Sequence, residues 1–179
     1  MRQKPLPLLP ETSLIHGGGT RAGKRKTARP LAVKCPLHVT MRSSIAKGSM
    51  SMLHPKRERL VNDQVRKVSQ KHGIRLKRYV NVGNHLHLIV QIPSKSAWKS
   101  FIRELAGTLA MLMTGARKGS SQKFWDGTAF TRIVTWGRDY ENLKRYFIKN
   151  RFEAAGVSVR KARAQGLELI HLGWGTTFS

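Results

Sequence analysis

The sequence is poor in cysteine, in acidic residues and in long apolar runs, and each shortage excludes a class of protein. A single cysteine, Cys35, cannot form an internal disulfide and suits a reducing compartment. The longest weakly polar run, residues 105–116, is shorter than the roughly 20 residues that cross a bilayer. Prolines and Glu11 interrupt the apolar residues near the amino end, which disfavours a secretory signal. We therefore expect a cytoplasmic protein without a membrane partner.

The shortage of acidic residues constrains both the partner and the chemistry. Nine Asp and Glu stand against 34 Lys and Arg, which gives a formal net charge of +25 spread along the whole chain. Such a field attracts polyanions, of which nucleic acid is the abundant one, and no basic amphipathic helix supports an anionic membrane surface instead. The nine acids also show no cluster that would predict a nuclease with two carboxylate-bound metal ions. We expect a nucleic-acid partner.

Composition divides the chain into three parts. Residues 1–32 combine prolines, a glycine triplet and a basic cluster without periodicity, and we predict a flexible basic arm. Residues 33–156 carry the periodic segments and should form one domain, because 40% of the chain is hydrophobic and can supply a core. Residues 157–179 are predicted to be a basic C-terminal tail.

The periodic segments predict an α+β fold. β-forming residues or period-two alternation indicate strands within residues 31–42, 74–82, 85–90 and 124–136. Helical spacing and glycine stops indicate helices over residues 55–73, 94–115 and 139–156, the last with Asp139 as its cap. The first six elements match the split βαβ, or ferredoxin-like, arrangement of an antiparallel sheet with two helices on one face. The seventh element is an additional C-terminal helix.

Two histidines stand two apart on the third predicted strand. Successive side chains of a strand point to opposite faces, so His85 and His87 share one face while Leu86 and Leu88 face the helices. Two neutral imidazoles on a rigid strand form half of a metal site. Histidines with this spacing also occur as ordinary, partly exposed strand residues, so the pattern leaves both interpretations open.

The last predicted helix supplies a second pair of polar residues. Tyr146 and Asn150 are one turn apart on one face, so a phenol nucleophile and an amide oxygen could act together. The basic residues around them, which suit phosphate groups, are Lys144, Arg145, Lys149 and Arg151. In the alternative interpretation Tyr146 belongs to the packed face of the helix with Phe147, and Asn150 is a surface residue.

These segments resemble a known family. GNHLHLIV is similar to the His-hydrophobic-His signature of the HUH single-tyrosine transposases, within the group of REP-associated tyrosine transposases. HVTMR at 38–42 resembles the first strand of that family, and FWDGTAFTRIVTWGRDYENLKRYFIKN resembles its last strand and tyrosine helix. The resemblance covers about residues 33–156. Gly83 and Arg151 stand where the family has proline, and the aromatic-Ser-Ser segment after the helix is missing.

The resemblance implies a function and a set of roles. His85, His87 and Asn150 would be metal ligands for Mg²⁺ or Mn²⁺, although imidazole also suits zinc, and Tyr146 would be the nucleophile. The family implies cleavage and rejoining of single-stranded or hairpin DNA through a 5′-phosphotyrosine, by a monomer or a homodimer. The basic residues of the helix would contact DNA, and Trp98, Trp125 and Trp136 could stack on bases or belong to the core.

Other interpretations remain open at this point. Tyr140 and Tyr79 are rival nucleophiles, although neither has an Asn one turn further on. A non-catalytic nucleic-acid-binding module is the main alternative function, either a transposase relative that has lost cleavage or an RRM-like domain, whose aromatic signature is missing. A basic structural protein would explain the charge but not the four site residues.

Overall fold

The computed structural model describes residues 16–19, 29–117 and 122–157. The elements, in chain order, are β1 (His16–Gly19), β2 (Leu37–Arg42), the short 3₁₀ helix η2 (Gly48–Met50), α1 (Pro55–Lys71), β3 (Arg75–Asn81), β4 (His85–Gln91), α2 (Lys95–Thr114), β5 (Thr128–Ile133) and α3 (Arg138–Ala154). None of the helices in the described part of the chain is long and apolar enough to cross a membrane.

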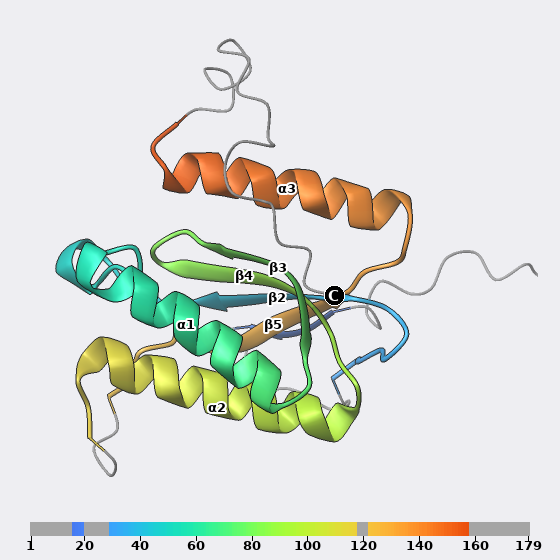
Figure 1. The fold of residues 1–179 in the computed structure, drawn as a ribbon, viewed down its shortest axis with the longest axis horizontal. Coiled ribbons are helices and arrows are strands. Elements are labelled where there is room, and N and C mark those ends of the chain that lie inside the picture. Colours follow the sequence, from blue (N-terminus) through green and yellow to red (C-terminus); the bar gives the residue numbers. More distant parts are fainter. Residues whose placement is uncertain (1–15, 20–28, 118–121, 158–179) are drawn as a thin grey trace, which may run out of the picture.

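The strands form one antiparallel sheet in the order β1-β5-β2-β4-β3. In the four strands β5-β2-β4-β3, the helix α1 connects β2 to β3 and α2 connects β4 to β5, which is the split βαβ arrangement. Both helices cover one face of the sheet, and α3 crosses the opposite face (Figure 1). The predicted α+β class is confirmed, with the C-terminal helix as a separate third layer.

Strand alternation divides the apolar residues between two cores. Every second residue of the central strands, such as Val39 on β2 and Leu88 on β4, is fully buried under α1 and α2. A smaller core lies under α3, where Phe147 is fully buried against Ile89 of β4 and Val134. This second core covers only part of its face, so polar side chains of β2 and β4 can occupy the rest.

The turn between β3 and β4 determines where β4 begins. Gly83 has φ 88, and an added Cβ would lie 2.8 Å from Ser51 Oγ, so the turn needs glycine. Asn81 donates to the Met52 carbonyl and accepts from the Gly83 amide, which ties the turn to the segment before α1. The strand that carries both histidines therefore starts at a firmly held position.

The prediction of an irregular N-terminal arm is wrong for residues 16–19. Residues 16–19 lie within the segment expected to lack regular structure, yet they form β1 and pair with the edge strand β5. The edge of β5 otherwise presents unpaired backbone groups, which a neighbouring segment can satisfy. The rest of the arm up to residue 28, and the tail from residue 158, lie outside the described residues.

The start of α3 also differs from the prediction. The N-cap is Gly137 rather than Asp139, which lies inside the first turn. Its carboxylate accepts from the Arg132 guanidinium at 2.9 and 3.0 Å and from the Thr135 amide at 3.1 Å. A basic partner on β5 thus draws Asp139 into an ion pair, and the helix begins one residue earlier.

Candidate active site

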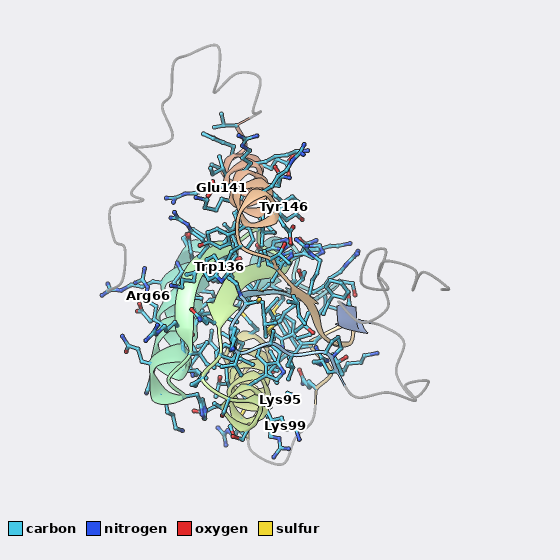
Figure 2. The ribbon with its side chains drawn as sticks, turned by 90° about the vertical axis from the view of Figure 1, so that its right-hand side faces the viewer. Arg66, Lys95, Lys99, Trp136, Glu141 and Tyr146 are labelled. Carbon is cyan, nitrogen blue, oxygen red and sulfur yellow. The ribbon has the colours of Figure 1, made fainter. Side chains whose placement is uncertain are left out.

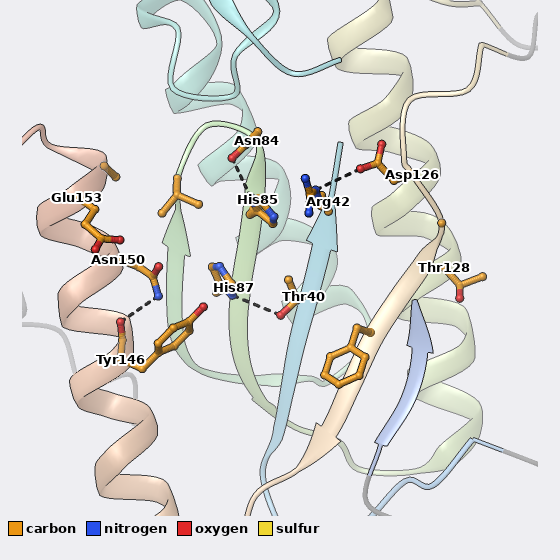
Figure 3. A pocket seen from close by; sticks show the side chains of 14 residues that line it. Thr40, Arg42, Asn84, His85, His87, Asp126, Thr128, Tyr146, Asn150 and Glu153 are labelled. Carbon is orange, nitrogen blue, oxygen red and sulfur yellow. Dashed lines mark hydrogen bonds and ion pairs between the residues drawn. The ribbon is translucent and has the colours of Figure 1, made fainter. Parts of the chain in front are cut away.

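A cavity of about 690 Å³ lies between α3 and the sheet. Figure 3 shows it from close by, with β4 and β2 at its base and α3 along one side. The lining residues are Thr40, Arg42, Val82, Asn84, His85, His87, Asp126, Gly127, Thr128, Phe130, Tyr146, Asn150, Glu153 and Ala154. The structure therefore brings all four residues of the predicted metal and nucleophile set to one cavity.

The two histidines present the same ring nitrogen to this cavity. Their rings are stacked, with centroids 5.9 Å apart. His85 Nδ1 lies 2.7 Å from Asn84 Oδ1, and His87 Nδ1 lies 3.3 Å from Thr40 Oγ1. These contacts occupy Nδ1 of each ring, so Nε2 is the atom that each ring can offer to an ion.

Burial keeps both imidazoles in the form that binds metals. Desolvation, together with a smaller contribution from the neighbouring His85, lowers the pKa of His87 to about 4. Desolvation also lowers the pKa of His85, with a smaller contribution from the positive charge of Arg42. Both rings are therefore neutral at neutral pH, as a ligating imidazole must be.

Helix α3 directs Tyr146 and Asn150 at the histidines. Tyr146 is 42% exposed, its hydroxyl points into the cavity (Figure 3), and its ring centroid lies 5.5 Å from that of His87. Asn150 is only 9% exposed, and its Nδ2 donates to the Tyr146 carbonyl at 2.9 Å. That bond orients the amide so that its oxygen is the atom left for a ligand. The alternative of a packed Tyr146 and a surface Asn150 is wrong, because Phe147 fills the packed position instead.

The rival tyrosines lie elsewhere. Tyr140 packs against Trp136, with ring centroids 5.0 Å apart, and does not line the cavity. Tyr79 faces the core under α1 and α2, on the other side of the sheet. Among the three tyrosines of the chain, all of them within the described residues, Tyr146 is thus the one that reaches the cavity.

The three tryptophans that were considered for base stacking differ in their exposure. Trp98 is 2% exposed in the main core, and the indole of Trp125 donates to the Ala106 carbonyl of α2. Trp136 is 51% exposed, and its indole N–H donates to the Lys34 carbonyl, which holds the ring against the surface. Of these three, Trp136 alone is accessible enough for a base to stack on it.

The cavity contains charged residues that the sequence did not indicate. Arg42 Nε lies 3.4 Å from an oxygen of Asp126, and both residues line the cavity. The Ser44 amide donates to Asp126, and this hydrogen bond lowers the pKa of that carboxyl. Arg42 could have been suspected from its alternation with His38 and Thr40. Asp126 could not, because it lies in a loop 84 residues further along the chain.

The four basic residues predicted to bind DNA lie on α3 but do not line the cavity. Lys144 contacts Glu141 at 2.7 Å, and Lys149 lies 3.7 Å from Glu153. Arg145 is exposed and Arg151 is half-buried. They lie on the helix that borders the cavity but are not among the residues that line it.

Two histidines and one asparagine are the residues of the cavity that could bind a divalent ion together. In the described ranges no three His, Cys, Asp or Glu side chains converge as a metal site would require. The residues that do converge are His85, His87 and Asn150, which offer two ring nitrogens and an amide oxygen. Such a mixed set, open on the cavity side, suits Mg²⁺ or Mn²⁺ with further positions left for phosphate oxygens.

The comparisons with known proteins agree with the predicted family. The family described as "Transposase IS200 like" matches residues 33–151, which is more than half of the chain. The fold and the cavity thus belong to a transposase domain. The chain is a member of the IS200-like transposase family.

Two solved structures have a similar chain path. A REP-associated tyrosine transposase bound to a REP hairpin is 15% identical, with a TM-score of 0.49 over 80% of this chain and 87% of that one. A protein of Deinococcus radiodurans R1, provisionally described as a transposase, is 16% identical, with a TM-score of 0.44 over 71% of this chain and 98% of that one. No protein of curated function matches the chain.

Proposed function

We propose that this transposase cleaves and rejoins single-stranded DNA through a transient bond between Tyr146 and a 5′ phosphate. The observation that carries the proposal is the cavity, where the Tyr146 hydroxyl, two neutral imidazoles and the Asn150 amide meet. Membership of a transposase family and a net charge of +25 agree with a DNA substrate. A non-catalytic binding module would not need a phenol beside these groups.

The proposed step is a phosphoryl transfer. The Tyr146 hydroxyl gives up its proton as its oxygen forms a bond to phosphorus, and the bond from phosphorus to the 3′ oxygen breaks. The 3′ oxygen takes up a proton and leaves as a hydroxyl, so the net transfer is one proton from the phenol to the 3′ oxygen. Mg²⁺ or Mn²⁺ held by His85, His87 and Asn150 would polarise the phosphate and stabilise its growing charge. One phosphodiester replaces another, so a 3′-hydroxyl can reverse the step and join strands without ATP.

Other residues of the chain would position the DNA. Arg42 lines the cavity and can exchange its contact with Asp126 for a phosphate oxygen. The basic residues of α3 would hold neighbouring phosphates, and Trp136 would stack on an unpaired base. The proposed catalytic unit is residues 33–156, with the residues before and after it as basic extensions.

Adduct formation tests the proposal. The protein is incubated with Mn²⁺ and a labelled single-stranded oligonucleotide that contains a hairpin, and a denaturing gel separates any covalent product. We expect a shifted band for the wild-type protein and for the control Tyr140→Phe, and none for Tyr146→Phe. An adduct in Tyr146→Phe would refute the nucleophile. Tight binding with no adduct in the wild type would support the non-catalytic alternative.

A further inference from the structure

Two residues that line the cavity, Thr40 and His87, contact a third polar side chain, His38, which has no role in the chemistry above. His38 Nε2 lies 3.4 Å from His87 Nδ1, and Thr40 Oγ1 lies 3.3 Å from His87 Nδ1 and 3.4 Å from His38 Nε2. Thr40 is directly opposite His87 in the pairing of β2 with β4, and His38 is two residues along the same face. Three polar groups therefore meet at one point.

The number of protons in this group is limited. A neutral imidazole carries one N–H, and a threonine hydroxyl both donates and accepts. In one arrangement His87 Nδ1–H donates to Thr40, Thr40 donates to His38 Nε2, and His87 Nε2 keeps its lone pair for the cavity. In the reverse arrangement the proton sits on His87 Nε2, which closes that nitrogen to a metal ion.

The neighbouring histidine indicates which arrangement the site uses. An amide oxygen can only accept, so the 2.7 Å contact of His85 Nδ1 with Asn84 Oδ1 places the proton of His85 on Nδ1. Ligating histidines generally donate their other ring N–H to such an acceptor. Among the described residues, the groups that contact His87 Nδ1 are His38 Nε2 and Thr40 Oγ1 rather than a carboxylate or an amide.

We propose that His38 is a positioning residue, which accepts the hydrogen-bond chain from His87 through Thr40 and so keeps His87 Nε2 open toward the cavity. This role rests on the proposed function, because an open Nε2 matters only if the cavity binds an ion. His38 also contacts α3, since its ring centroid lies 5.5 Å from that of Phe147 and 6.0 Å from that of Tyr146. One side chain thus links the orientation of a metal ligand to the helix that carries the nucleophile.

Two variants separate hydrogen bonding from packing. His38→Phe keeps a ring against Phe147 but removes the acceptor, so Thr40 would donate to His87 Nδ1 and move the ring proton to Nε2. His38→Gln places an amide oxygen near the former Nε2 and should restore the chain. His54→Gln is the matched control, because His54 caps α1 and does not line the cavity. Circular dichroism and thermal melting select variants that are folded.

The first measurement is the tautomer of His87 in the metal-free protein, from the ¹⁵N chemical shifts of its ring. We expect the Nδ1–H form in the wild type, His38→Gln and His54→Gln, and the Nε2–H form in His38→Phe. The second is Mn²⁺ affinity by electron paramagnetic resonance, which should fall about tenfold or more in His38→Phe alone.

An Nε2–H wild type, or a His38→Phe variant with the wild-type tautomer and affinity, would overturn the proposal. If Mn²⁺ binds to none of these proteins while the tautomers follow expectation, the hydrogen-bond chain stands and the proposed metal chemistry fails.

Discussion

At the scale of single residues, the site depends on which atom each side chain leaves free. Asn150 is buried, and its nitrogen is engaged by the carbonyl of Tyr146, so its oxygen is the remaining polar atom. His85 and His87 are each engaged at Nδ1, so each offers Nε2. The neighbours of the donors thus select the donor atoms, and substitutions that keep or remove one atom can test each role.

Asn150 offers such a test. Asn150→Leu removes the amide oxygen that we propose as a metal ligand, and we expect Mn²⁺ affinity to fall at least tenfold by isothermal titration calorimetry. Asn150→Asp supplies a charged oxygen and should keep or raise the affinity. It should also destabilise the metal-free protein by about 1–3 kcal/mol, because a buried carboxylate then faces the Tyr146 carbonyl without a donor. Equal affinity in the wild type and Asn150→Leu would remove Asn150 from the donor set.

At the scale of elements, one helix attached by a small core carries half of the site. α3 packs on the sheet through Leu143 and Phe147, and only a few apolar residues of the sheet meet them. The main core, by contrast, joins α1 and α2 to the sheet along their full buried faces. The position of Tyr146, the proposed nucleophile, should therefore be more sensitive to packing than the position of the histidines.

Phe147 tests this dependence. Phe147→Ala leaves a cavity under α3, and we expect it to lower the free energy of unfolding by about 3–5 kcal/mol in a urea titration. Adduct formation should fall as well, because Tyr146 is next to the lost contact. Phe147→Leu retains most of the volume and should keep most of the activity. Full adduct formation by a folded Phe147→Ala protein would show that this core does not position the helix.

At the scale of the whole molecule, basic residues lie on both sides of the sheet, on α1 and α2 as well as on α3. Arg66 on α1 and Lys95 and Lys99 on α2 lie on the far side of the sheet from Tyr146 (Figure 2). The charge excess of +25 does not locate the proposed DNA substrate, whereas the proposed function places the reacting strand at the cavity on the α3 face. The attraction is general, whereas the phosphates held in place should be those near α3.

Salt dependence separates these two effects. The logarithm of the binding constant should fall linearly with the logarithm of the salt concentration, with a slope of about −0.7 for each single-strand phosphate contacted. We expect Arg145→Gln to make that slope shallower by about 0.7, the contribution of one phosphate contact. Lys99→Gln, the control on α2, should change the slope little. Fluorescence anisotropy of a labelled oligonucleotide measures both. Equal effects of the two substitutions would place the DNA elsewhere.

The buried histidines make the stability of the whole molecule dependent on pH. Burial lowers the pKa of His38 to about 3 and that of His87 to about 4, below the ordinary value of about 6.5. The unfolded chain therefore takes up these protons first as the pH falls below about 6.5, and the folded state loses stability until its own pKa values are reached.

Between pH 6.5 and pH 5 we expect each of the two histidines to cost about 1.5 kcal/mol in the metal-free protein. Urea titrations at the two pH values measure the loss. His38→Gln should remove about half of it. A free energy of unfolding that does not change over this range would contradict the burial of both rings.

Local patterns in the sequence were sufficient for the three α-helices, the strands β2 to β5, the family and four residues of the candidate site. Period two placed His85 and His87 on one face of a strand, and the helical period placed Tyr146 beside Asn150. Both patterns depend only on the geometry of a single element, so they can be recognised without knowing what lies next to it.

Only the tertiary structure decided what surrounds those four residues. His38 and Thr40 meet His87 through strand pairing, Arg42 at the end of β2 meets Asp126 in the segment before β5, and β1 pairs with β5 inside a segment predicted to be irregular. These contacts join residues about 50 to over 100 positions apart, and they form because each element buries its apolar face against another. The chain determined which side chains share a face by local geometry, and packing between distant segments determined which faces meet.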